Sequence, residues 1–155
     1  MSGFSANYSQ MVMPDHINVV GTLFGGQMIA WVDLAAAKVA FRFLKGADID
    51  GAVTRAIEKV EFKEPVYLGD WVNFTATVIS SGRTSFSIEV EAYAEGRHSQ
   101  SRLACVATVI MVAVKKDADG NEQYVGGVLN EKSYMSAFRL QTYIATQFKP
   151  TVAKA

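Results

Sequence analysis

One aspartate lies among apolar residues in a stretch that has the composition of a helix. Residues 25–43 open with two glycines, contain no proline and are rich in alanine, the residue with the highest helix propensity. At about 100° per residue, Asp33 falls on the side of this helix that carries Ile29, Val32 and Ala36, away from its stripe of polar side chains. We therefore expect a buried carboxylate that is hydrogen-bonded, paired or protonated.

Two interpretations of Asp33 are open from this pattern alone. A structural aspartate would be satisfied by a nearby backbone amide or a threonine hydroxyl at little cost in stability. A reactive aspartate would act as a general base or a nucleophile with a tuned pKa. The helical wheel favours neither.

The composition indicates one globular domain over residues 1–155. Half of the residues are hydrophobic, and 15 lysines and arginines balance 15 aspartates and glutamates. The chain has no basic run, which argues against a nucleic-acid partner. Its one cysteine, Cys105, fits a reducing compartment. We read no signal peptide at the N-terminus, and the longest apolar run is too short to span a bilayer, so we expect a cytoplasmic protein with no membrane partner.

Alternating and β-branched residues predict several strands around the helix. The opening strand precedes the helix, and four more follow in meander-like succession, which gives an α+β fold with one antiparallel sheet wrapped around one long helix. The apolar last strand should be central or covered on both faces. A candidate helix lies in the C-terminal tail, and we assign it no function. The predicted strands are residues 8–13, 53–62, 71–79, 85–93 and 103–114, and the tail helix is residues 133–147.

These residues together resemble the hot-dog-fold acyl-CoA thioesterases, in the small bacterial branch similar to the YciA-type enzymes. The resemblance covers about residues 11–119 and so gives a core of residues 8–119. It rests on Pro14, Asn18, Gly21, Phe24-Gly25-Gly26, Trp31, Asp33, Val53-Thr54, Phe62, Pro65-Val66, Gly69-Asp70 and Gly82-Arg83-Thr84-Ser85. The family usually has a residue such as alanine before the asparagine, where this chain has Ile17.

The resemblance implies hydrolysis of an acyl-CoA thioester to a free acid and CoA. Asp33 would match the catalytic carboxylate of the family, either activating water or attacking the carbonyl. Asn18 would match the asparagine that helps to hold the water or the thioester. A thioester is already activated, so a positioned water, a base and a donor to the developing oxyanion are sufficient.

The resemblance also assigns the CoA nucleotide to the stretch Gly82, Arg83, Thr84 and Ser85. Without it, a solvated arginine in a hairpin turn is the better interpretation of this stretch. Thr54 could line the site or could simply be a β-branched strand residue. Among the other candidates, we expect His16 to be a capping or exposed histidine, and Cys105 and Phe41 to fill the core.

The glycine pair Gly25 and Gly26 could form an oxyanion hole. Backbone N–H groups at a helix start are unpaired, the helix dipole favours negative charge there, and a missing Cβ allows close approach. The pair could equally serve a turn or close packing. Gly26 and Asp33 are seven residues apart, about 10 Å along the axis at 1.5 Å per residue, so one thioester carbon can hardly use both from one helix. A two-fold dimer would bring the amide of one subunit to the carboxylate of the other.

We therefore expect a homodimer with sites between its subunits, and the family suggests a tetramer or hexamer. We expect no cofactor, because CoA is part of the substrate, and no metal, because two histidines and one cysteine do not form a ligand cluster. Two alternatives stay open. A hot-dog dehydratase acting on 3-hydroxyacyl thioesters would pair a histidine with its acid, and a non-catalytic acyl-CoA-binding sensor would carry a DNA-binding helix pair.

Overall fold

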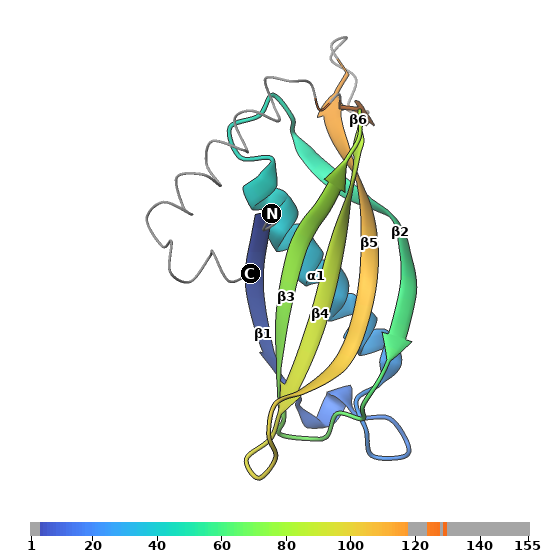
Figure 1. Cartoon of the computed structure of the whole chain (residues 1–155). Coiled ribbons are helices and arrows are strands. Elements are labelled where there is room, and N and C mark those ends of the chain that lie inside the picture. Colours follow the sequence, from blue (N-terminus) through green and yellow to red (C-terminus); the bar gives the residue numbers. More distant parts are fainter. Residues whose placement is uncertain (1–3, 118–123, 128, 130–155) are drawn as a thin grey trace, which may run out of the picture.

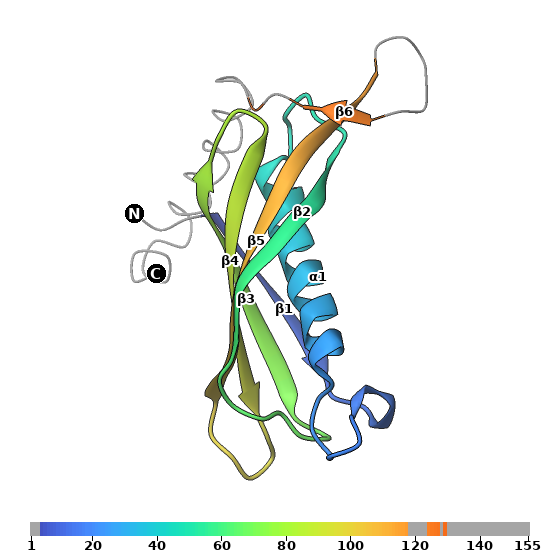
Figure 2. The same ribbon diagram turned by 90° about the vertical axis from the view of Figure 1, so that its right-hand side faces the viewer.

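A long helix packs against one face of an antiparallel sheet in the computed structural model, which describes residues 4–117, 124–127 and 129 (Figure 1). The helix and the sheet form two layers, as the turned view in Figure 2 shows. In chain order the elements are β1 (Phe4–Met11), the short 3-10 helix η1 (Pro14–His16), α1 (Gly25–Phe43), β2 (Gly51–Phe62), β3 (Trp71–Ser81), β4 (Ser85–Glu95), β5 (Arg102–Lys116) and β6 (Tyr124–Gly126).

The sequence-based prediction of this fold is confirmed in its main features and wrong in its strand order. The helix has the predicted bounds, and β3, β4 and β5 follow one another as antiparallel neighbours. The strand β2 is not part of that meander, because it pairs with β5 at the edge opposite β1. Both sides of β2 are largely exposed, which suits an edge strand. The predicted tail helix at 133–147 lies outside the described residues.

The helix lies with one apolar stripe against the inner face of the sheet. Its buried residues recur every three or four positions, as an amphipathic helix requires, and on each central strand every second residue is buried beneath them. Phe43 packs against Phe4 and Phe86 with ring centroids 6.1 and 5.1 Å apart, and Trp31 contacts Phe74 at 6.4 Å. Strand β5 lies between β4 and β2, so its predicted central position is confirmed. Within the described residues, no helix is long and apolar enough to cross a membrane.

Two irregularities interrupt the pairing of β2 with β5. The register shifts between Thr54 and Ala56 and again between Glu58 and Glu61, so each time β2 contains one more residue than its partner. At the second bulge Lys59 has a φ of 54°, the left-handed conformation that residues with a Cβ rarely adopt. Sequence periodicity did not predict either bulge.

The strain at Lys59 leads to a stability prediction. A left-handed conformation costs a non-glycine residue about 1–2 kcal/mol, whereas glycine adopts it freely and loses more entropy on folding. Lys59→Gly should therefore raise the free energy of unfolding by roughly 0.5–1 kcal/mol, and Lys59→Val should lower it. Urea unfolding measures both changes, and Lys63→Gly serves as the control because Lys63 has no positive φ and should lose stability. A loss of stability in Lys59→Gly equal to that of the control would contradict the strain.

Candidate functional site

Asp33 lies at the side of α1 that faces the edge strand β2. The Thr54 hydroxyl donates a hydrogen bond to Asp33 Oδ1 at 2.5 Å. Within the described part of the chain, Asp33 Oδ2 accepts no hydrogen bond, so it can meet water or a ligand. The expectation of full burial is wrong, because Asp33 is half-buried. The helical wheel found the correct side of the helix, but at a sheet edge that side is only partly covered.

The first bulge of β2 places Thr54 opposite the carboxylate. Thr54 pairs with Met111, which is buried on the inner face, and Ala56 pairs with the next residue along β5, Ile110. Arg55 is therefore the extra residue. With regular pairing, Arg55 would occupy the inward position opposite Met111, and Thr54 would point to the outer face. The insertion thus selects a neutral hydroxyl, and not a guanidinium, as the neighbour of Asp33.

The helix begins at the glycine pair with its first amides free. Phe24 is the N-cap residue and supplies no side-chain cap, and its carbonyl accepts from the Gln27 and Met28 amides. Among the hydrogen bonds of the described residues, none is donated by the backbone N–H of Gly25 or Gly26. A Cβ on Gly26 would lie 2.6 Å from the Phe24 ring, so a side chain there would require that ring to move. These amides can receive an anionic oxygen.

Asn18 organises the loop that leads to these glycines. Its Oδ1 accepts from the backbone N–H groups of Val20 and Thr22, both at 3.0 Å, and its Nδ2 donates to Thr22 Oγ1 at 2.9 Å. One amide proton of Asn18 is left for another acceptor. In the structure Asn18 therefore holds its own turn, and its predicted contact with water or thioester stays a prediction.

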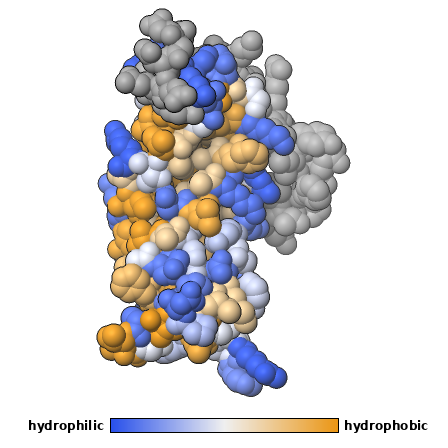
Figure 3. Space-filling view, turned by 180° about the vertical axis from the view of Figure 1, so that it is seen from behind, coloured by the Kyte–Doolittle hydropathy of each residue, from blue (hydrophilic) through white to orange (hydrophobic). Residues whose placement is uncertain are grey.

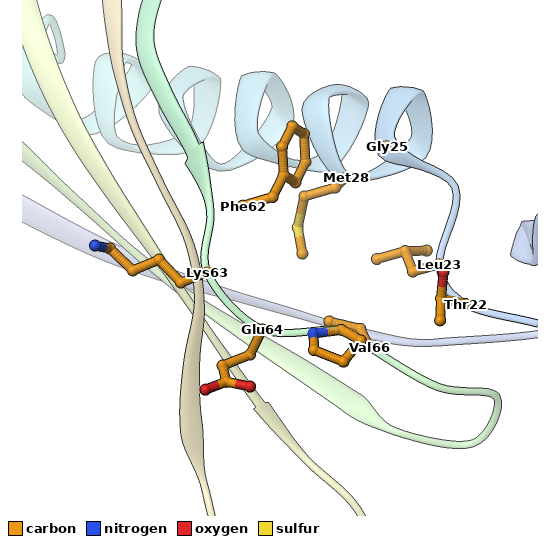
Figure 4. Close-up of a pocket in the computed structure, with 9 residues that line it drawn as sticks. Thr22, Leu23, Gly25, Met28, Phe62, Lys63, Glu64 and Val66 are labelled. Carbon is orange, nitrogen blue, oxygen red and sulfur yellow. The ribbon is translucent and has the colours of Figure 1, made fainter.

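A pocket of about 320 Å³ opens beside the start of α1. In Figure 4 the side chains of Phe62 and Met28 lie between the helix and the end of β2, whereas Lys63 and Glu64 point away from them. Asp33 is not among the residues that line this pocket. The lining residues are Thr22, Leu23, Gly25, Met28, Phe62, Lys63, Glu64, Pro65 and Val66.

The second bulge of β2 directs Phe62 toward this pocket. Phe62 pairs with Cys105, which is buried on the inner face, and the extra residue after Glu58 sets this register. With regular pairing, Glu61 would occupy that place. Phe62 was part of the sequence resemblance, but no role was assigned to it. The resemblance therefore singled out Phe62, but the sequence did not show to which side of the strand its side chain points.

The hairpin at residues 82–85 lies at the other end of the molecule. It joins the upper ends of β3 and β4, whereas the glycine turn lies at the lower end of α1 (Figure 1). The Gly82 amide donates to Ser85 O at 2.7 Å, the Thr84 carbonyl accepts from the Ala113 amide, and the Arg83 side chain is exposed. The structure therefore does not bring this hairpin together with Asn18, Gly25 and Gly26 in one chain.

Of the remaining candidates, His16 and Cys105 have the structural positions that were expected, whereas Phe41 does not. His16 is half-buried; its Nδ1 accepts from the Met13 amide at 2.9 Å, and its ring contacts Trp31, which confirms a capping histidine. Cys105 is buried, as expected, and burial raises its pKa to about 11, which disfavours a thiolate at neutral pH. The core position of Phe41 is wrong, because its side chain is 69% exposed. Phe41 lies outside the buried stripe of the helix that packs against the sheet.

Metal-ligating side chains are dispersed over the described part of the chain. No group of three histidine, cysteine, aspartate or glutamate residues there is close enough to hold a metal ion. The chemistry available at the site is that of a carboxylate, a hydroxyl and free backbone amides.

Comparison with known proteins assigns a family to this arrangement. The thioesterase superfamily model matches residues 20–100. An uncharacterized acyl-CoA thioester hydrolase of Zymomonas mobilis is 32% identical over 108 residues, 69% of this chain and 70% of that protein. The acyl-CoA thioester hydrolase YciA of Salmonella typhimurium is 32% identical over 111 residues, 69% of this chain and 80% of YciA. The crystal structure of a hexameric hot-dog-fold thioesterase of Campylobacter jejuni covers 88% of this chain and 96% of its own at 30% identity, with a TM-score of 0.63. The chain has the hot-dog fold and belongs to the thioesterase superfamily.

Proposed function

We propose that this protein is an acyl-CoA thioester hydrolase in which Asp33 carries the reaction. The observation that supports this most directly is the carboxylate on α1, which is held at Oδ1 by Thr54 and open at Oδ2. Asp33 either takes a proton from the attacking water or attacks the carbonyl carbon itself. Water provides the new C–O bond of the acid, the C–S bond breaks, and the CoA sulfur leaves with a proton.

In this proposal the glycine turn stabilises the charge that develops on the carbonyl oxygen. The free amides of Gly25 and Gly26 at the positive end of the helix dipole suit a tetrahedral oxyanion. Asn18 keeps this turn in place, and its remaining amide proton is available to the water or the thioester. The apolar lining of the adjacent pocket, which includes Leu23, Met28 and Phe62, suits an acyl group.

The site is proposed to lie between two copies of the chain. The outer edge of β2 has no strand beside it among the described residues, and two large apolar side chains are exposed near it: Val53 belongs to β2, and Phe41 lines a pocket together with Gly51 and Ala52. Figure 3 shows hydrophobic surface along this side of the molecule. A two-fold dimer formed here would bring Asp33 of one copy toward the glycine turn of the other. The hexameric relative makes a trimer of such dimers the larger assembly that we propose.

The remaining features of the proposal concern CoA and the surroundings of the enzyme. CoA enters as part of the substrate, so we propose that no cofactor is needed. Gly82, Arg83, Thr84 and Ser85 would bind its nucleotide, with Arg83 pairing to phosphate. The neutral charge balance and the buried thiol fit a cytoplasmic enzyme without nucleic-acid partners.

Replacing the carboxylate tests the catalytic assignment. Asp33→Asn keeps the shape of the side chain but can neither take a proton nor attack, so kcat should fall by about 10²-fold or more while the protein stays folded. Release of free thiol from acyl-CoA measures the rate, and circular dichroism confirms the fold. Asp15→Asn is the matched control, because Asp15 is exposed outside the site. Activity near the wild-type level in folded Asp33→Asn protein would refute the assignment.

Removing the guanidinium tests the nucleotide contact. A phosphate contact far from the carbonyl binds substrate and transition state alike, so Arg83→Ala should raise KM for acyl-CoA by about tenfold and leave kcat unchanged. A small thioester that lacks the nucleotide should be hydrolysed as by the wild type. Arg97→Ala, an exposed arginine in the other hairpin, is the control. An equal loss of hydrolysis with both substrates would assign Arg83 a structural role.

Mixed subunits test the shared site. In homodimers of Asn18→Ala or Asp33→Ala every site carries a defect, and both should be nearly inactive. A mixed dimer collects both defects in one site and leaves the other intact. Refolding the two variants together in equal amounts makes about half of the dimers mixed, so roughly a quarter of wild-type activity should return. Native mass spectrometry identifies the hybrids, and inactive hybrids would place the whole site in one subunit.

A further inference from the structure

Asp70 carries the one buried charge in the described part of the chain, with 7% of the residue exposed. Its Oδ2 accepts from Arg102 Nη2 at 2.7 Å and from the Tyr67 amide at 2.9 Å. The same Nη2 also donates to Pro65 O at 2.9 Å. Arg102 thus links the start of β5 to the segment of residues 63–70, which connects β2 to β3.

The β4–β5 hairpin holds this ion pair from its other side. Arg102 Nη1 donates to Ser99 Oγ at 3.2 Å, and Ser99 Oγ also accepts from the Gly96 amide at 2.9 Å. A Cβ on Gly96 would lie 2.6 Å from Asp70 Oδ1. The guanidinium therefore uses its planar fork to hold Asp70, Pro65 and the hairpin at once, and there is no room for a larger residue at Gly96.

The segment that Arg102 holds forms a wall of the pocket beside the glycine turn. Pro65 and Val66 line this pocket. The Val66 carbonyl accepts from the Leu23 amide at 2.7 Å, and Tyr67 forms a β-bridge with Thr22. Leu23 is followed directly by Phe24, the helix N-cap, and by Gly25. A short path of hydrogen bonds and chain therefore leads from Arg102 to the amides at the start of α1.

We propose that Arg102, held by Asp70, is a positioning residue for the hydrolysis. Arg102 is not among the residues that line the pocket, and it acts through Pro65 and Val66 on the glycine turn. This inference rests on the proposed thioesterase function and extends it. Displacing the oxyanion donors weakens the transition state more than the bound substrate, so loss of this support should lower kcat more than it changes KM.

Arg102→Lys is the first test. Lysine keeps the charge but lacks the planar fork, so it cannot reach Asp70, Pro65 and Ser99 together. We expect kcat for acyl-CoA to fall by about tenfold with KM changed less than about twofold. Hydrogen exchange at the Leu23 amide should become faster, because its acceptor is no longer fixed. Arg97→Lys, an exposed arginine in the same hairpin, should change neither reading.

A second variant and a stability control separate positioning from general destabilisation. Gly96→Ala pushes Asp70 away from the opposite side and should reproduce both effects, so it decides the question if Arg102→Lys does not fold. Phe4→Leu, in β1 at the edge of the sheet opposite β2, should lower the Tm but leave kcat and exchange at Leu23 unchanged below the transition. Wild-type kcat and exchange in folded Arg102→Lys or Gly96→Ala protein would overturn the proposal. If the wild type hydrolyses no acyl-CoA, the proposed function fails, whereas exchange at Leu23 still tests the linkage.

Discussion

The packing of α1 against the inner face of the sheet fixes how far apart the candidate reactive groups of one chain can be. The buried stripe from Met28 to Phe43 allows the helix neither to slide nor to rotate without exposing large side chains. Gly25 begins this helix, and Asp33 lies more than two turns along it. The carboxylate and the free amides are therefore held at a constant separation. A reaction that needs both at one carbon has to find the second group elsewhere.

Irregularities in the edge strand β2 change which of its side chains face the helix, whereas the rigid helix itself allows no such change. Each of its two bulges inserts one residue and so exchanges the inner and outer sides of the strand residues beyond it. The first brings the Thr54 hydroxyl to Asp33, and the second brings Phe62 to the glycine turn. Strained or irregular backbone costs stability, and here it occurs beside the candidate reactive groups and away from the regular centre of the sheet. The edge strand therefore both terminates the sheet and positions side chains beside the candidate reactive groups.

Sequence patterns predicted the bounds of the helix and strands well, but they predicted less well which strands pair and what covers each side chain. Alanine-rich composition and flanking glycines gave α1 its bounds, and alternation gave β3 and β4. Periodicity states which residues share a side, but not what lies opposite, so the burial of Asp33 and Phe41 was overestimated. Alternation also leaves strand order open, which is why β2 was placed in the meander.

Thr54 was found only through the family motif, since a β-branched residue in a strand attracts no attention on its own. The Asp70–Arg102 pair joins residues 32 positions apart, and no local pattern indicates such a contact.

Under the proposed function, each chain would carry two different half-sites on one rigid frame. One half contains Asp33 and Thr54, and the hairpin at residues 82–85 is near it, because Ser85 and Val53 both pair with Val112 and are about 10 Å apart across two strand spacings. The other half contains the glycine turn, the Asn18 loop and the apolar pocket, which Arg102 supports from behind. Under the proposed function, the first half would hold CoA and the base, and the second the acyl group and the oxyanion. An elongated substrate such as acyl-CoA needs one of each, and two copies related by a two-fold axis supply that combination twice.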